Sequence, residues 1–279
     1  MSQEIATEVK EENKMGTMPV GKLIFNMSLP MMVSMLVQAL YNIVDSIFVA
    51  KLSENALTAV SLAFPLQTLL IAVGAGTGVG MNALLSRALG AKQNDEANKI
   101  ASNAAFLYII SYIVFLILGF TVVKPFYASQ IGNADVEIME MGIDYLSTVM
   151  IFSMGLLAQI CFERLLTSTG RTIFSMTSQL CGAITNIILD PILIFGLIGF
   201  PKMGVTGAAL ATVIGQCVGA LVAFICNHKF NPDVKLQFRG FRPDGRIIRT
   251  IYAIGIPSII MQSIGSVMTY SMNRILITF

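Results

Sequence analysis

Long apolar segments constrain the fold of this chain more than any other feature. Six largely apolar segments follow one another between short polar connections, and a seventh begins near residue 250. A run of roughly 20 such residues is long enough to cross the hydrocarbon core of a bilayer as an α-helix. The segments are residues 23–49, 56–83, 102–123, 143–165, 174–197, 205–227 and 250–279. The sequence therefore predicts an all-α membrane protein that crosses the bilayer several times.

The composition agrees with a membrane protein and excludes several other classes. Only 12% of the residues are charged and the mean hydropathy is +0.74, whereas about 25% of the residues in soluble domains are charged. The net charge of +2 gives no reason to expect a nucleic-acid partner. The four cysteines form no CxxC pair, so we expect neither a disulfide framework nor a zinc site.

Basic residues predict how the helices are oriented. If residues 1–18 form a cytoplasmic tail, the outer connections contain only Lys51, Lys124 and Lys202. Apart from Arg274 in the last segment, every other Lys and Arg then falls at an inner end. Cytoplasmic connections of membrane proteins are rich in Lys and Arg. We therefore expect a cytoplasmic N-terminus and a multi-pass protein of the inner (cytoplasmic) membrane.

The longest polar connection separates two apolar regions that resemble each other at their starts. The segment KLIFNMSLPMMVSMLVQALYN can be aligned with RTIYAIGIPSIIMQSIGSVMT, so that Pro30 falls on Pro257. Parallel repeats of this kind are typical of two-lobe transporters. We expect this chain to hold the first lobe and the start of the second. The expected parts are a cytoplasmic tail (1–18), a six-helix transmembrane lobe (19–228), a cytoplasmic connection (229–248) and the first helix of the second lobe (249–279).

Three carboxyl groups inside apolar segments mark a candidate functional site, because ionisable residues at membrane depth are costly. Each shares a helix face with other polar residues at helical spacing. The polar stripes are Gln38, Asn42 and Asp45; Gln159 and Glu163; Gln179, Asn186 and Asp190; and Thr212 and Gln216. Four such stripes predict a helix bundle around a polar cavity.

These polar residues also have simpler interpretations. Amide and hydroxyl side chains can hold a bundle together by hydrogen bonds between helices. Asp45 lies near a helix end, where it can reach interfacial water, and Glu163 can form a plain salt bridge with Arg164. Hydrogen bonding alone accounts for the amides better than it accounts for three carboxyl groups.

The stretch NIILDP, residues 186–191, places an amide, a carboxyl group and a proline together. Pro191 has no N–H and its ring clashes with the carbonyl of Ile187, so we expect a kink there, as at Pro30. A carboxylate, an amide oxygen and a freed carbonyl can hold a proton or a hard cation such as Na⁺. We therefore expect an ion site at Asp190 and Asn186, and no other metal.

The glycine-rich stretch GAGTGVGMN, residues 74–82, predicts close helix packing. It lacks the Lys-Ser/Thr of a P-loop and the preceding strand of a dinucleotide fingerprint. Gly74 with Gly78, and Gly76 with Gly80, form GxxxG pairs that let helix backbones approach closely. Because the sequence contains no ATPase motif, we expect any active transport to be driven by an ion gradient.

The chain resembles the multidrug and toxic compound extrusion (MATE) family of secondary transporters over about residues 20–279. The similarity lies in NIVDSIFVAKLSENALTAVSLAFPL, LLSRALGAKQNDEANK, ERLLTSTGRTIF, and NIILDPILIFG followed by MGVTGAALATVIGQ. The resemblance implies twelve helices in two lobes around an inverted-V cavity. It also implies export of organic cations or drugs in exchange for H⁺ or Na⁺, by alternating access.

The resemblance assigns roles to the polar residues of this sequence. Those expected to couple the ion are Asp45, Asn186 and Asp190, and those expected to line the substrate cavity are Gln38, Asn42, Glu163, Thr212 and Gln216. Glu163 falls where many relatives have a neutral polar residue; it adds a cation-attracting charge or moves the coupling site. The implied partners are cationic small molecules and membrane lipid, with no cofactor besides the coupling ion. We expect the full-length protein to be a monomer.

Two other functions fit this sequence less well than drug export. A lipid-linked saccharide flippase of the same broad superfamily would share the two-lobe plan, but it should line its cavity with several Arg and Lys to hold pyrophosphate. An intramembrane enzyme could use Asp45 and Asp190 as paired acids, but no metal-binding His or nucleophile accompanies them. We therefore expect a transporter rather than an enzyme.

Overall fold

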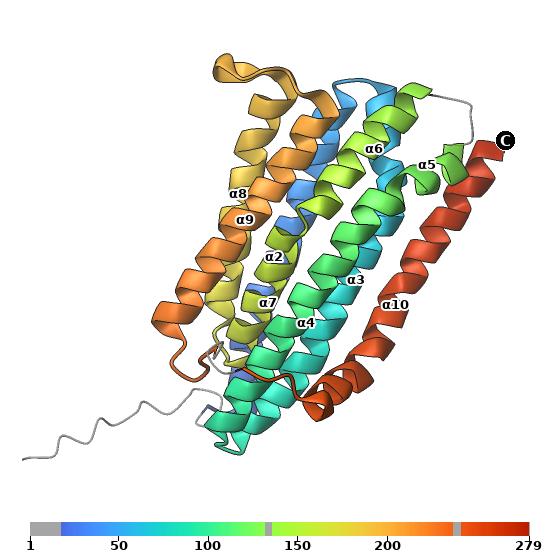
Figure 1. Ribbon diagram of the computed structural model, residues 1–279. Coiled ribbons are helices and arrows are strands. Elements are labelled where there is room, and N and C mark those ends of the chain that lie inside the picture. The colour runs from blue at the N-terminus through green and yellow to red at the C-terminus, as the bar shows by residue number, and fades with distance from the viewer. Residues whose placement is uncertain (1–17, 132–135, 237–240, 279) are drawn as a thin grey trace, which may run out of the picture.

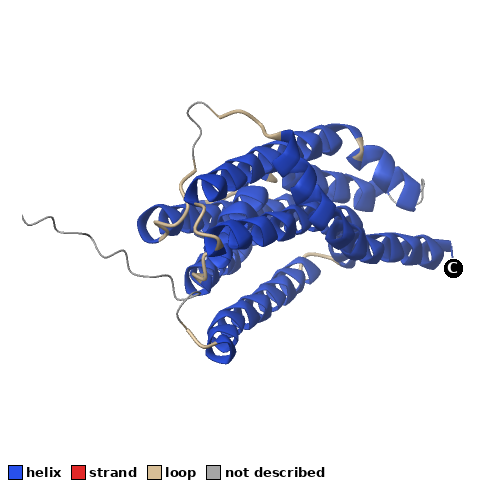
Figure 2. Cartoon of the chain, turned by 90° about the horizontal axis from the view of Figure 1, so that it is seen from below, coloured by secondary structure: helices blue, strands red, loops and turns tan. Residues whose placement is uncertain are grey.

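The computed structural model describes residues 18–131, 136–236 and 241–278. Across these ranges the chain forms nine α-helices and one short 3₁₀ helix, and no strand (Figures 1 and 2). The all-α prediction is therefore confirmed. The predicted tail up to residue 17 and the basic residue Arg239 lie outside the described residues.

Seven membrane crossings fit these helices, as the sequence predicts. Six helices are long and apolar enough to span a bilayer, and α6 and α7 together can form a seventh. The helices are α2 (Val20–Ala50), α3 (Glu54–Gly90), α4 (Asn94–Thr121), α5 (Val123–Ile131), α6 (Val136–Ile151), α7 (Met154–Ser168), α8 (Thr172–Phe195), α9 (Gly204–Phe230) and α10 (Gly245–Thr278), with the 3₁₀ helix at Leu197–Gly199.

The fourth predicted segment, 143–165, is wrong as a single continuous helix. The helical region begins earlier, at Val136, and breaks after Ile151, where α6 and α7 meet at an angle of 44°. Ser153 lies in the break and Gly155 in the first turn of α7, and a Gly/Ser pair is a common cause of a sharp bend. The bend also brings Gly155 against Cys217 of α9, where a Cβ would lie 2.7 Å from the Cys217 sulfur.

Local signals in the sequence account for the ends of several helices. Ser53 caps α3, because its hydroxyl accepts a hydrogen bond from the backbone N–H of Ala56 at 3.0 Å. Gly196 ends α8 with φ of +74°, a left-handed conformation that glycine adopts without strain. Pro30 and Pro191 lie inside helices that continue through them, so the kinks expected there stay predictions.

Successive helices run in alternating directions through the bundle. In Figure 1 the connections α2–α3 and α8–α9 lie at the upper end, and α3–α4, α7–α8 and α9–α10 lie at the lower end. The upper connections contain Lys51 and Lys202, whereas most of the basic residues fall at the lower connections. The end with few basic residues and the end with many therefore lie on opposite sides of the bundle, as the prediction of orientation requires.

The predicted glycine packing on α3 occurs against two neighbouring regions. Gly76 and Gly80 face α10: a Cβ at Gly76 would lie 3.0 Å from the carbonyl oxygen of Gly255, and one at Gly80 would collide with the backbone of Ile251. On another face of α3, Gly78 lies against Arg164 of α7. We call the contact between α3 and α10 the α3–α10 seam. These glycines let α3 approach both neighbours more closely than any other residue would.

The connection from α9 to α10 is anchored to α4 at two points. The backbone N–H of Lys235 donates to the Asn98 side chain at 2.7 Å, and the N–H of Asp244 donates to Asn103 at 2.9 Å. Arg171, in the α7–α8 turn, forms an ion pair of 3.6 Å with Asp233. Both ends of this connection are therefore tied to other helices at the same end of the bundle, the lower end in Figure 1.

Candidate functional site

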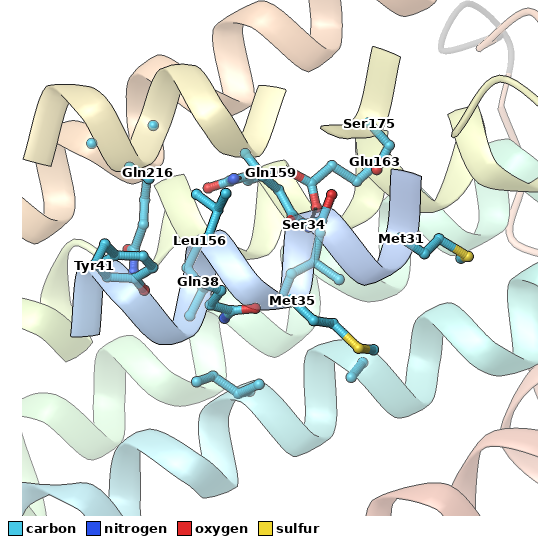
Figure 3. Close-up of a pocket in the computed structure, with 18 of the residues that line it drawn as sticks. Met31, Ser34, Met35, Gln38, Tyr41, Leu156, Gln159, Glu163, Ser175 and Gln216 are labelled. Carbon is cyan, nitrogen blue, oxygen red and sulfur yellow. Dashed lines mark hydrogen bonds between the residues drawn. The ribbon is translucent and has the colours of Figure 1, made fainter. Parts of the chain in front are cut away.

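A cavity of about 210 Å³, lined by both apolar and polar side chains, lies between α2, α3, α7, α8 and α9 (Figure 3). It contains four of the five residues predicted to line a substrate cavity, together with the predicted ion residue Asn186. Its polar lining consists of Ser34, Gln38, Tyr41, Gln159, Glu163, Arg164, Thr167, Thr172, Ser175, Gln179, Asn186, Thr212 and Gln216. The predicted bundle with a polar interior is therefore present in the structure.

Figure 3 shows that the cavity has two distinct ends. Tyr41 and Gln216 lie at one end, and Glu163 and Ser175 lie at the other with Met31. Tyr41 and Gln216 come from α2 and α9, which are distant in the sequence, whereas Glu163 and Ser175 come from the consecutive helices α7 and α8. The cavity can therefore place different chemical groups against different parts of one ligand.

The carboxyl group of Glu163 is held by neutral hydrogen-bond donors. Its side chain is buried, and its oxygens accept from Gln159 at 2.9 Å, from Ser178 at 3.1 Å and from Gln179 at 2.8 Å. It forms no ion pair with the neighbouring Arg164, so the plain salt bridge considered above is not present. Consecutive residues of a helix are rotated by about 100° around its axis, so the side chains of Glu163 and Arg164 leave α7 in different directions.

The end of the cavity that contains Tyr41 and Gln216 leads to a buried cluster around Asp190. The side-chain N–H of Asn186 donates to Asp190 at 3.3 Å and to the hydroxyl of Thr212 at 3.4 Å. Asp190 is fully buried, and Asp45 of α2 lies close enough to interact with it electrostatically. The predicted ion residues Asp45, Asn186 and Asp190 thus come together, although only Asn186 lines the cavity itself.

Several oxygen atoms of this cluster have no hydrogen-bond partner. They are Oδ1 of Asp45, Oδ1 of Asn186 and Oδ2 of Asp190. Buried polar atoms are normally paired, because leaving one unpaired costs free energy. Three unpaired oxygens from two neighbouring helices are the kind of donor set that a proton or a hard monovalent cation would satisfy. Across the described ranges, no group of three or more His, Cys, Asp or Glu side chains is arranged to hold a metal ion.

Asn42 is the one predicted lining residue that lies outside the cavity. It is exposed, while Gln38 on the same helix lines the cavity and Asp45 is partly buried. A helix turns about 100° per residue, so Asn42 is rotated by about 40° from Gln38, whereas Asp45 is rotated by about 20° in the opposite direction. The predicted polar face of α2 is therefore broad enough that Asn42, at its edge, lies outside the cavity.

Several polar residues of the site were not predicted from the sequence: the hydroxyl residues Ser34, Thr167, Thr172 and Ser175, and the three larger side chains Arg164, Tyr41 and Tyr145. Arg164 lines the cavity, although the distribution of charge places it among the inner basic residues. Tyr41 lines the cavity, and Tyr145 of α6 lies close enough to Asp45 to interact with it and accepts a hydrogen bond from Gln67 at 3.2 Å. Tyr41 could have been found from its helical spacing with Gln38 and Asp45, but Tyr145 gives no such signal.

These features define a multi-pass helical membrane protein that encloses a cavity with many polar side chains, next to one fully buried and one partly buried acid. Residues 30–192 match the model of the MatE family. The chain therefore belongs to the MATE family of transporters, as its sequence segments indicate.

The relatives support this assignment in sequence and in structure. The multidrug export protein MepA of Staphylococcus haemolyticus (strain JCSC1435) is 30% identical over 264 residues, which are 93% of this chain and 56% of the relative. MepA of Staphylococcus aureus (strain MRSA252) is 30% identical over 248 residues, or 88% and 53% of the two chains. This chain thus spans about half the length of the curated relatives it matches.

Solved structures show the same arrangement of helices. A crystal structure of MATE in complex with MaL6 is 32% identical, with a TM-score of 0.79 over 86% of this chain and 52% of that one. A crystal structure of MATE in the bent conformation is 30% identical, with a TM-score of 0.77 over 87% and 53%. The fold of this chain is therefore that of one part of a MATE transporter.

Proposed function

We propose that this chain forms the ion-coupling half of a secondary antiporter that exports organic cations across the cytoplasmic membrane in exchange for H⁺ or Na⁺. The observation that carries the proposal is the set of unpaired oxygens around the fully buried Asp190. Its N-terminus would lie in the cytoplasm, because most basic residues cluster at that end of the bundle. The relatives described as multidrug export proteins agree with this function.

Ion binding at Asp190 would change how α2 and α8 attract each other. A charged carboxylate that is buried without a partner is unfavourable, so Asp190 needs a proton or a cation. With the ion bound, Asp45 and Asn186 can share it, and α2 is drawn towards α8. Without the ion, the carboxylates of Asp45 and Asp190 repel each other. Loading and release of one ion can therefore bias the lobe between two arrangements, which is the requirement for alternating access.

The end of the cavity that contains Glu163 would attract the substrate. Glu163 supplies a negative charge at the cavity wall, and Met31 and Met35 supply flexible apolar surface. Methionine side chains adapt to ligands of different shape, which suits a multidrug cavity. Cationic molecules with apolar rings are therefore the substrates that this lining favours.

The lining gives little support to the alternative of a lipid-linked saccharide flippase. Among the described residues, Arg164 is the single basic side chain that lines the cavity. A pyrophosphate group carries more than one negative charge and is commonly held by several Lys and Arg side chains. One arginine beside a carboxylate is a poor match for that ligand.

Efflux of a cationic dye tests this proposal. Cells that lack their own exporters would express the gene that encodes this chain, and ethidium efflux would be compared with that of Asp190→Asn. The matched control is Asp144→Asn, since Asp144 is exposed on α6 and does not line the cavity. We expect efflux to be lost in Asp190→Asn and kept in Asp144→Asn.

Two further arms identify the ion, one with a protonophore and one without Na⁺. If dye efflux is lost only with the protonophore, the coupling ion is H⁺. If it is lost only without Na⁺, the coupling ion is Na⁺. Full efflux by Asp190→Asn would refute the coupling role of this residue. An absence of dye efflux from well-expressed wild-type protein would refute cation export itself.

A further inference from the structure

The hydroxyl group of Ser178 has more hydrogen-bond acceptors than it can serve. It lies 3.1 Å from Oε1 of Glu163 in α7 and 2.8 Å from the backbone carbonyl oxygen of Gly219 in α9. A serine hydroxyl carries a single hydrogen, so it can donate fully to only one of these two oxygens. Because a carbonyl oxygen never donates, the protonation state of Glu163 decides whether both contacts can be satisfied.

The close packing of α8 and α9 holds Ser178 between these two oxygens. A Cβ at Gly182 would lie 2.9 Å from the carbonyl oxygen of Gly215, and a Cβ at Gly219 would lie 2.7 Å from the carboxamide of Gln159. Ser178 itself has no exposed surface. A solvent molecule therefore cannot take the place of a hydrogen-bond partner that this group lacks.

A proton on Oε1 of Glu163 satisfies the whole group. Glu163 then donates to the oxygen of Ser178, and Ser178 donates to Gly219, which gives one continuous chain from α7 through α8 to α9. The amides of Gln159 and Gln179 still donate to the carboxyl group, at 2.9 and 2.8 Å. With an ionised carboxyl group, either Glu163 or Gly219 loses its bond to Ser178, and an unpaired buried acceptor costs free energy.

Arg164 is the only other charged side chain of the cavity lining among the described residues, and it does not pair with Glu163. It acts on Glu163 electrostatically, but its stem turns towards Gly78 of α3 and no ion pair joins the two side chains. The residues that α2, α3, α8 and α9 contribute to the lining are uncharged. Tyr108 of α4 also lies within electrostatic reach, and a tyrosine is neutral at neutral pH. The direct partners of this carboxyl group are therefore all neutral.

We propose that Glu163 is a second proton-binding site, separate from the Asp190 cluster, and that it carries a proton while the cavity is empty. This inference rests on the proposed function and deepens it, because Glu163 attracts a cationic substrate only after it gives up this proton. The step is a plain proton transfer: the O–H bond of the carboxyl group breaks, water that enters the cavity takes the proton, and the cation neutralises the carboxylate. Each transport cycle then releases a proton at Glu163 besides the ion at Asp190.

Infrared spectroscopy of the empty chain in phosphatidylcholine nanodiscs tests the proton directly. A protonated carboxyl group has a C=O stretching band that a carboxylate lacks and that shifts in D₂O. We expect Glu163→Gln to lose one component of this band at neutral pH. The amide of the glutamine can still donate to Ser178, so the fold should be kept. The matched control is Asp144→Asn, an exposed acid that should leave the band unchanged. An unchanged band in Glu163→Gln would show that Glu163 is ionised and would overturn the proposal.

Ser178→Ala tests the hydrogen-bond chain without touching the carboxyl group. The Glu163 component should remain, because the proton stays, but its frequency should shift when the acceptor of its O–H group is gone. Ser271→Ala is the control, since Ser271 is exposed on α10 and donates to its own helix at 2.8 Å. A component that keeps its frequency in Ser178→Ala would remove Ser178 from the chain and refute the argument for the proton.

Proton release during dye binding connects this site with the proposed substrate. A pH indicator in weakly buffered solution would report the protons released when ethidium binds to the chain in nanodiscs. We expect the wild-type chain to release one proton more for each bound dye than Glu163→Gln. Equal release would overturn the exchange of the proton for a cation. If the wild-type chain binds no ethidium, the proposed cation cavity fails, whereas the infrared band still decides whether Glu163 carries a proton.

Discussion

The α3–α10 seam makes a quantitative prediction about helix packing. A Cβ added at Gly80 would collide with the backbone of Ile251, which a side-chain rotation cannot relieve. Gly80→Ala must therefore push α10 away from α3. Overpacking of this kind costs about 2 kcal/mol, of which the better helix propensity of alanine offsets about 1 kcal/mol. For a chain of this size we expect the melting temperature to fall by about 2–4 °C.

Gly265→Ala is the matched control for this substitution. Gly265 lies in the middle of α10, is exposed, and has nothing within 4 Å of the position that a Cβ would take. Alanine is a better helix former than glycine by about 1 kcal/mol. The same chemical change should therefore leave the melting temperature unchanged or raise it by a few degrees.

Buried cysteines provide the assay. Cys161 is 3% exposed, whereas Cys217 is exposed and Cys181 is partly exposed; once Cys181 and Cys217 are replaced by alanine, a thiol-reactive fluorophore should label the chain only when the bundle unfolds. Labelling during a temperature ramp in detergent gives the melting temperature of each variant. If Gly80→Ala melts at the same temperature as Gly265→Ala, the close approach of α3 and α10 is not what stabilises this pair of helices.

Three further expectations follow from other contacts. Tyr127→Phe removes the buried hydroxyl that donates to a carbonyl of α3 at 2.8 Å, and should reduce the free energy of unfolding by about 1 kcal/mol; an unchanged melting temperature would contradict this. Arg171→Gln breaks a partly exposed ion pair, so it should reduce that free energy by at most about 1 kcal/mol, with less effect in about 1 M salt. In a cysteine-free background, a membrane-impermeant maleimide should label Lys202→Cys in intact cells and not Lys92→Cys; the reverse pattern would invert the proposed orientation.

The sequence predicts the membrane spans well because their signal is the length of an apolar run. A span is set by bilayer thickness, and that property needs no knowledge of neighbouring helices. The break between α6 and α7 was missed because Ser153 and Gly155 do not interrupt the apolar run. Their effect depends on the approach of α9 at Cys217, a contact between helices that are distant in the sequence.

The difference between a local sequence signal and a contact between distant helices also explains which site residues were predicted. Asp45, Asn186 and Asp190 stand out because polar atoms are rare in apolar segments. Arg164 was assigned to the inner surface because a count of charges treats every arginine near a helix end alike. Only the packing of α7 against Gly78 shows that its stem turns into the cavity.

The two anchors of the α9–α10 connection bear on how this protein tolerates changes in length. The N–H groups of Lys235 and Asp244 are fixed to Asn98 and Asn103 of α4. The ring of Phe241 also lies 5.7 Å from the ring of Phe106, which belongs to α4 as well. The point at which α10 starts is thus set by α4 and not by the number of residues between the anchors. An insertion between 236 and 241, such as an epitope tag or a natural extension, should leave the direction of α10 unchanged.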